Sequence, residues 1–163
     1  MMRKTLSFIV ILVVLVSFSS AYNAQEIDVK VNSFAPNISV SDNDSTFTLS
    51  KERGKYVLLN FWASDDAESR IRNISAYKAT EKSNEKVVFT AINYDRSEAL
   101  FSEIVKVDNI DKNTQFFDKG GKNSEVYKQF RLENGLNCYL INREGKVIAV
   151  NPELEKLAEL ISQ

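Results

Sequence analysis

Two runs of apolar residues dominate the pattern of the chain, and each predicts a buried strand. Residues 56–62 are YVLLNFW and residues 87–92 are VVFTAI. Almost every position in both runs is apolar, which is typical of strands covered on both faces. Asp65 and Glu68 follow the first run at the spacing of a capping box, so we expect a helix from about Asp65. The same spacing recurs from Asp95 and predicts a second helix.

Weaker patterns fill in the rest of the fold. In the helix near Asp65, apolar residues recur at helical spacing and should form its buried face: Ile71, Ile74 and Tyr77. Further segments predict a hairpin (38–49), a strand (114–117), a helix (124–130), a second hairpin (137–150) and a closing helix (152–161). This order predicts an α/β three-layer sandwich: a mixed central sheet, helices on both faces and an N-terminal hairpin.

The first 21 residues have the pattern of a secretory signal peptide. Arg3 and Lys4 precede an apolar stretch, residues 6–18, and small residues end at Ala21. The stretch is shorter than the roughly 20 apolar residues of a membrane-spanning helix. We therefore expect cleavage after Ala21, and an uncleaved anchor is the alternative. Residues 22–33 are polar overall and predict a flexible segment before a domain at 34–163.

Composition removes several kinds of chemistry. The net charge is −1 and the basic residues form no long run, so nothing indicates nucleic-acid binding. The chain has no histidine, which excludes the commonest general base and metal ligand. Cys138 is its one cysteine, so no intramolecular disulfide can form.

Three stretches resemble the extracytoplasmic thioredoxin-like family, which includes bacterial envelope thiol–disulfide oxidoreductases and, more distantly, the alkyl hydroperoxide reductase and thiol-specific antioxidant proteins. They are APNISV at 35–40, GKYVLLNFWA at 54–63 and YLINREGKV at 139–147. They occur in the family's order, and the resemblance covers about residues 34–161. It implies a thioredoxin-like fold.

The resemblance also shows that the family's active site is missing. Members carry Cys-x-x-Cys where the buried strand meets the helix, because the helix N-terminus stabilises a thiolate there. Asp66 stands at the nucleophile position and Ser69 at the resolving position. The family's cis-proline position holds Leu136, where a trans bond is expected because a non-proline cis bond costs about 2.5–4 kcal/mol. Asn60 replaces the buried Asp of cytosolic thioredoxins, as it does in many active envelope members.

The remaining candidate residues have ordinary structural interpretations. Cys138 lies in a late apolar strand and should be a buried, inert residue, with a regulatory or intermolecular thiol as the alternative. Asp65, Asp66 and Glu68 favour helix capping, because the spaced ligand loop of a calcium site is absent, and no metal is expected. Trp62 should be core or groove wall, and Arg70 a solvated helix residue.

Two hypotheses of function follow. The first is a redox-inactive thioredoxin-fold protein of the bacterial periplasm or cell envelope, with a binding, scaffold or accessory role. Its partner would be an unidentified envelope protein, with no cofactor, no nucleic acid and no membrane contact after leader removal. The second is a thiol-dependent oxidoreductase that acts through Cys138 or through a partner's thiols.

Overall fold

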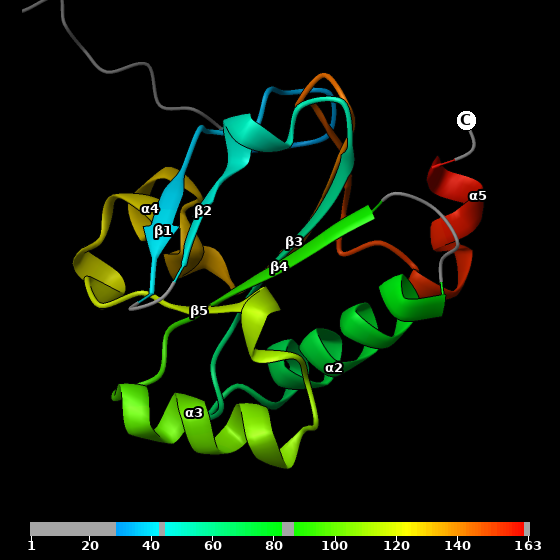
Figure 1. Cartoon of the computed structure of the whole chain (residues 1–163). Helices are drawn as coiled ribbons and strands as arrows, with labels where there is room; N and C mark the ends of the chain where they lie inside the picture. Colours follow the sequence, from blue (N-terminus) through cyan, green and yellow to red (C-terminus); the bar gives the residue numbers. More distant parts are fainter. Residues whose placement is uncertain (1–28, 43–44, 83–86, 162–163) are drawn as a thin grey trace, which may run out of the picture.

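A five-stranded mixed sheet forms the centre of the protein (Figure 1). The computed structural model describes residues 29–42, 45–82 and 87–161. The strand order is β5-β4-β3-β6-β7. Its strands are β3 (Tyr56–Trp62), β4 (Val87–Asn93), β5 (Gln115–Phe117), β6 (Cys138–Ile141) and β7 (Val147–Val150). β3, β4 and β5 are parallel, whereas β6 is antiparallel to both β3 and β7. The thioredoxin-like α/β fold predicted from the sequence is confirmed.

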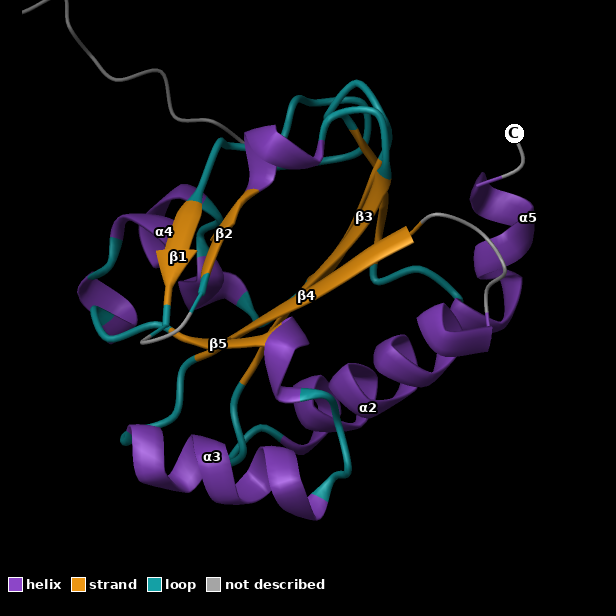
Figure 2. Ribbon diagram, in the orientation of Figure 1, coloured by secondary structure: helices purple, strands orange, loops and turns teal. Residues whose placement is uncertain are grey.

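Helices and a hairpin cover the two faces of the sheet (Figure 2). On one face lie α2 (Ala67–Lys82), α3 (Glu98–Val107) and α5 (Leu157–Ile161). On the other lie α4 (Glu125–Gln129) and the predicted hairpin of β1 (Ser39–Ser41) and β2 (Thr46–Thr48). Alternating residues of β3 separate the two cores: Leu58 and Trp62 face the first set of helices, and Phe61 faces the second. Burial on both faces explains why β3 is apolar at nearly every position.

The N-terminal segment is attached further upstream than expected. In its described part, Asn32 N–H donates to Val147 O at 2.8 Å, and Val147 N–H donates to Ser33 O at 2.9 Å. Phe34 bridges to Lys146. Residues 32–34 are therefore hydrogen-bonded to the edge of the sheet beside β7, while the flexibility predicted for residues 22–33 stays a prediction. The predicted signal peptide and residues 22–28 lie outside the described residues. Within the described ranges, none of the helices has both the length and the hydropathy of a membrane span.

Both predicted capping boxes are wrong in register. α2 begins at Ala67, and the residue that caps it is Asp66, not Asp65. α3 begins at Glu98, and Ser97 caps it by accepting from Leu100 N–H at 3.3 Å. A hydroxyl or carboxylate directly before the helix outcompetes one placed further upstream, because only the residue at the N-cap can reach the free N–H groups.

The buried face of α2 is partly polar, whereas the sequence predicted an apolar face. Ile71 is 63% exposed, while Ser69, Asn73 and Ala76 are buried. Asn73 Nδ2 donates to Gln115 Oε1 at 3.0 Å, and its Oδ1 accepts from Asn60 Nδ2 at 3.2 Å. α2 is therefore held to the sheet by a buried amide chain as well as by apolar packing. Ile74 and Tyr77 pack at the edge of the core, as expected.

Candidate functional site

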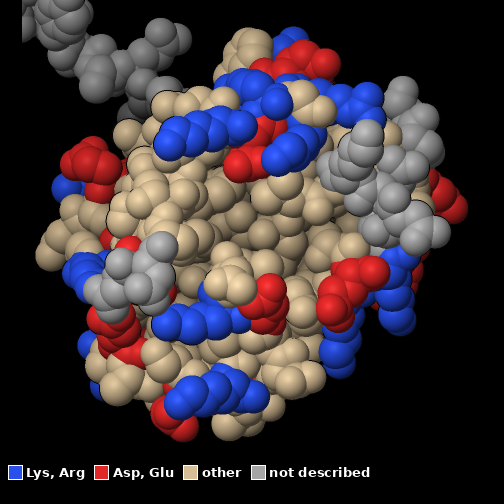
Figure 3. Space-filling view, in the orientation of Figure 1, with Lys and Arg blue, Asp and Glu red and all other residues tan. Residues whose placement is uncertain are grey.

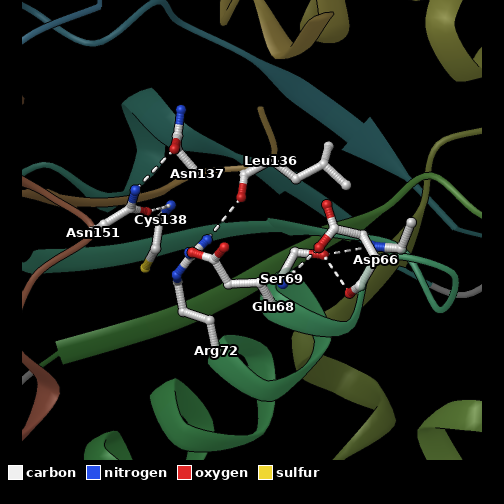
Figure 4. Close-up of polar contacts among 9 residues, drawn as sticks. Asp66, Glu68, Ser69, Arg72, Leu136, Asn137, Cys138 and Asn151 are labelled. Atoms are coloured by element: carbon white, nitrogen blue, oxygen red, sulfur yellow. Dashed lines mark hydrogen bonds and ion pairs between the residues drawn. The ribbon is translucent and has the colours of Figure 1, made fainter. Parts of the chain in front are cut away.

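Asp66 and Ser69 meet at the junction between β3 and α2, across the first turn of the helix (Figure 4). Asp66 Oδ1 accepts from Ser69 N–H at 3.0 Å. Ser69 Oγ donates to Asp66 O at 3.1 Å and accepts from Ala63 N–H at 3.2 Å. Ser69 is only 1% exposed. Its hydroxyl is thus fully used in holding the junction together.

The electrostatics of this helix N-terminus are already satisfied by the chain itself. A helix N-terminus carries about half a positive charge and favours an anion close by. In a thioredoxin that anion is a cysteine thiolate. Here the Asp66 carboxylate accepts the hydrogen bond, and a carboxylate cannot exchange with a disulfide. Asp66 therefore caps α2 at the position where a thioredoxin has its nucleophilic cysteine.

The loop before β6 lies against α2 and is held there by an arginine. No peptide bond among the described residues is cis, so the predicted trans bond before Leu136 is confirmed. Arg72 Nη1 donates to Leu136 O at 2.8 Å, while its Nη2 pairs with Glu68. The Arg72 side chain is largely buried between them. Sequence reasoning missed Arg72, because its partner lies 64 residues away.

Asn151 fastens the other side of the same loop. Its Oδ1 accepts from Cys138 N–H at 2.8 Å, and its Nδ2 donates to Asn137 Oδ1 at 2.9 Å. Asn151 has a φ of 48°, a left-handed conformation in which Asn is enriched. An asparagine before Pro152 was the only signal in the sequence, and it indicates a turn.

Between α2 and this loop lies a polar depression of about 220 Å³, which we call the polar groove. Its lining includes Asp66, Glu68, Arg72, Asn134, Asn137 and Asn151. Figure 4 shows side chains of this lining gathered from α2, the loop and the turn after β7. The lining holds amides, carboxylates and one guanidinium, so the groove can form hydrogen bonds but offers no nucleophilic thiol.

Cys138 lies beneath the groove and is fully buried, as predicted. It pairs with Asn60 across β3 and β6 and packs in the core that contains Leu58 and Trp62. Burial raises the pKa of the Cys138 thiol to about 12, although the Arg72 charge opposes the shift. The thiol is therefore protonated near neutral pH, and a protonated thiol is neither a nucleophile nor a good metal ligand.

Three neighbouring side chains have structural roles. Trp62 is fully buried, and its ring centroid lies 6.1 Å from that of Phe101, so it belongs to the core. The prediction that Arg70 is solvated is wrong: its Nη2 and Nε bind the Asp108 carboxylate at 2.6 and 2.9 Å, tying α2 to the end of α3. This pair raises the pKa of Arg70. Asp95 Oδ1 accepts from Ser64 N–H at 2.6 Å, which fixes the turn before α2.

Comparison with known proteins shows that the chain is similar to thioredoxin-like proteins. Residues 31–150 match the AhpC/TSA family. A thioredoxin-like protein from Parabacteroides distasonis is 40% identical, with a TM-score of 0.70 over 83% of this chain and 97% of that chain. A thiol-disulfide oxidoreductase from Bacteroides fragilis is 26% identical, with a TM-score of 0.64 over 78% and 96%. No curated protein matches the chain.

Proposed function

The chain belongs to the AhpC/TSA family of thioredoxin-like proteins, and we propose that it is a redox-inactive member whose role in the bacterial cell envelope is to bind another protein. One observation carries the proposal. Asp66 and Ser69, at the two positions of the family's cysteine pair, are bonded to each other and to the backbone around them. A site built this way stabilises the fold and cannot exchange disulfides.

A thiol-dependent activity through Cys138 has no support in the geometry. An attacking thiol must reach its disulfide and be partly ionised. The Cys138 side chain is fully buried beneath the polar groove, and burial raises its pKa to about 12. Catalysis through this residue would require the sheet to open at β6.

The polar groove is the surface that we assign to binding. It is lined by Asp66, Ser69 and Leu136, the positions that the resemblance assigns to the family's active site, and it forms a hollow of about 220 Å³. Asn134 is exposed at its rim. Arg72 already holds the Leu136 carbonyl, so a partner would be recognised mainly through the side-chain amides and carboxylates of the lining.

We expect no reductase activity. In an insulin-reduction assay with dithiothreitol as electron source, the protein should not exceed the dithiothreitol background, because the chain has no reactive thiol pair. A Cys138→Ser variant should behave identically. A thiol reagent should label Cys138 only after unfolding, since burial holds its pKa near 12. Turnover that depends on Cys138, or rapid labelling of the native protein, would contradict the proposal.

The binding role is tested by site-specific photo-crosslinking in the native envelope. A crosslinking residue in place of Asn134, on the groove rim, should give one discrete adduct with an envelope protein. The matched control is the same residue in place of Asn113, which is also exposed but lies beside β5, away from the groove. Equal adducts from both positions, or none from Asn134, would rule out the groove as the binding surface.

A further inference from the structure

A cluster of basic side chains covers the end of the sheet opposite the polar groove (Figure 3). We call it the basic end surface, and it consists of Lys30, Lys51, Arg53, Lys55, Arg143 and Lys146. These residues come from three segments: the stretch before β1, the loop before β3 and the turn between β6 and β7. β3 spans seven residues, so about 20 Å separates this surface from the groove at its other end.

Backbone and side-chain contacts hold the three segments together. Gly54 N–H donates to Arg143 O at 3.0 Å, which joins the loop before β3 to the β6–β7 turn. The Arg53 guanidinium lies directly against Gly145, where a Cβ would sit 1.9 Å from its Nη1. Gly145 also has a φ of +86°, so the turn needs glycine on both counts. These contacts hold the loop before β3 and the β6–β7 turn side by side, so their cations lie on one surface.

The charge of this surface differs from that of the whole protein. Among the residues that the structure describes, this surface carries six basic side chains and two acidic ones, Glu52 and Glu144, while the complete chain carries a net charge of −1. Glu52 is paired with Lys55 at 2.8 Å. A local excess of this kind on a slightly acidic protein attracts polyanions, and its effect decays over about 10 Å at 0.1 M salt.

Apolar side chains are interleaved with the cations. Phe34 is 59% exposed and Val31 is 47% exposed. Lys146 Nζ lies 5.3 Å from the centroid of the Phe34 ring, and the Arg143 guanidinium lies 5.2 Å from that of Tyr56. Basic side chains mixed with exposed aromatic and aliphatic groups are typical of surfaces that dock at the headgroup boundary of a membrane. A purely soluble polyanion would leave Phe34 and Val31 in water.

The sequence places the apolar run at 6–18 a short distance upstream of the basic end surface. Residues 19–28 separate the apolar run at 6–18 from Val29, the first described residue. A segment of about ten residues spans at most about 36 Å when fully extended. Asn32 is bonded to Val147, beside the basic turn. The chain therefore enters the domain at the basic end surface.

We propose that the basic end surface docks on a membrane that contains anionic phospholipids. The lipid phosphates would meet the cations, and Phe34 and Val31 would enter the headgroup boundary. This departs from the expectation of no membrane contact after leader removal. It is independent of the groove, which such docking would point away from the bilayer.

The test is vesicle flotation of protein purified from the envelope of expressing cells, with its N-terminus defined by intact mass. We expect at least tenfold tighter binding to vesicles with about 30 mol% phosphatidylglycerol than to phosphatidylcholine alone, and release in about 0.5 M salt. The triple variant Lys51→Glu, Arg143→Glu, Lys146→Glu should lose at least tenfold in affinity. The control triple variant Lys106→Glu, Lys112→Glu, Lys128→Glu makes the same change in net charge outside the basic end surface. It should bind the anionic vesicles much more tightly than the first triple variant does.

Circular dichroism checks that each variant folds, and the same three positions changed to Gln give a milder set with an intermediate loss. A retained leader, which includes Arg3 and Lys4, would contribute equally to every variant, so it cannot produce a difference between the two triple variants. Equal losses in the two triple variants would overturn the proposal. So would binding that ignores phosphatidylglycerol, or binding to polyphosphate without any binding to vesicles.

Discussion

A chain that carries Asp66→Cys and Ser69→Cys, with Cys138→Ser, is expected to form an intramolecular disulfide in mild oxidant. Residues three apart on a helix are neighbours on one face, and this is the spacing of the Cys-x-x-Cys pair that forms a disulfide at the helix N-terminus in the family. Asp66 and Ser69 already contact each other in both directions across the first turn of α2. A free-thiol count on the folded protein should fall from two to zero, with the protein remaining monomeric.

The thiol introduced in place of Asp66 should have a pKa below the free value of about 8.5, because the helix N-terminus stabilises its thiolate. Asp65 and Glu68 oppose this shift by repelling a negative charge. The decrease should therefore be smaller than in a natural family member. It can be measured from the pH dependence of alkylation in the Asp66→Cys, Cys138→Ser variant.

The matched control pairs Asp65→Cys with Ser69→Cys in the same Cys138→Ser background. Asp65 is exposed and precedes the cap of the helix, so it should not bridge to the buried position 69. Losing the Asp66 cap costs about 1 kcal/mol, so the oxidised chain must be compared with its reduced form. If both thiols of the Asp66, Ser69 pair stay free, or link only between molecules, these residues do not occupy the family's cysteine positions.

Asn73→Ala should lower the free energy of unfolding by about 3 kcal/mol, because it strips two buried amides of their partners. The Asn60 Nδ2 donor loses its bond to Asn73 Oδ1, and the Gln115 Oε1 acceptor loses its bond to Asn73 Nδ2. All three side chains are at most 1% exposed, so water cannot replace the lost bonds without entering the core. Urea denaturation followed by circular dichroism measures the change.

The control for this loss is Ser75→Ala, on the exposed side of the same helix. It removes a polar group from α2 without touching the amide chain, and should change the free energy of unfolding by less than about 0.5 kcal/mol. A loss below about 1 kcal/mol for Asn73→Ala would mean that Asn60 and Gln115 find other partners. The amide chain would then contribute little to holding α2 on the sheet.

The central strands could be predicted because burial on both faces leaves a pattern in adjacent residues. β3 begins and ends where its apolar run does, and β4 extends only one residue beyond its run, to Asn93. The helix starts were less predictable, because Asp65 and Asp66 are chemically equivalent and only the turn after β3 decides which becomes the cap. Ser97 was overlooked for the same reason.

The candidate site was only partly accessible from the sequence. The resemblance identified Asp66, Ser69 and Leu136, since their positions follow from neighbouring motifs. The residues that hold the site together have partners far along the chain: Arg72 binds Leu136 O, and Arg70 binds Asp108. The residues next to Arg70 and Arg72 in the sequence give no indication that either arginine has such a distant partner. The polar buried face of α2 was hidden in the same way.

Arg72 bears on what a working reductase site on this scaffold would require. Its guanidinium bridges Glu68 and the Leu136 carbonyl and holds the loop in place from the side of α2. Two cysteines in place of Asp66 and Ser69 would leave this contact intact and the bond before Leu136 trans. A reductase engineered here would therefore need at least a third substitution, in the loop or at Arg72, and the position of the loop becomes a design variable separate from the thiols.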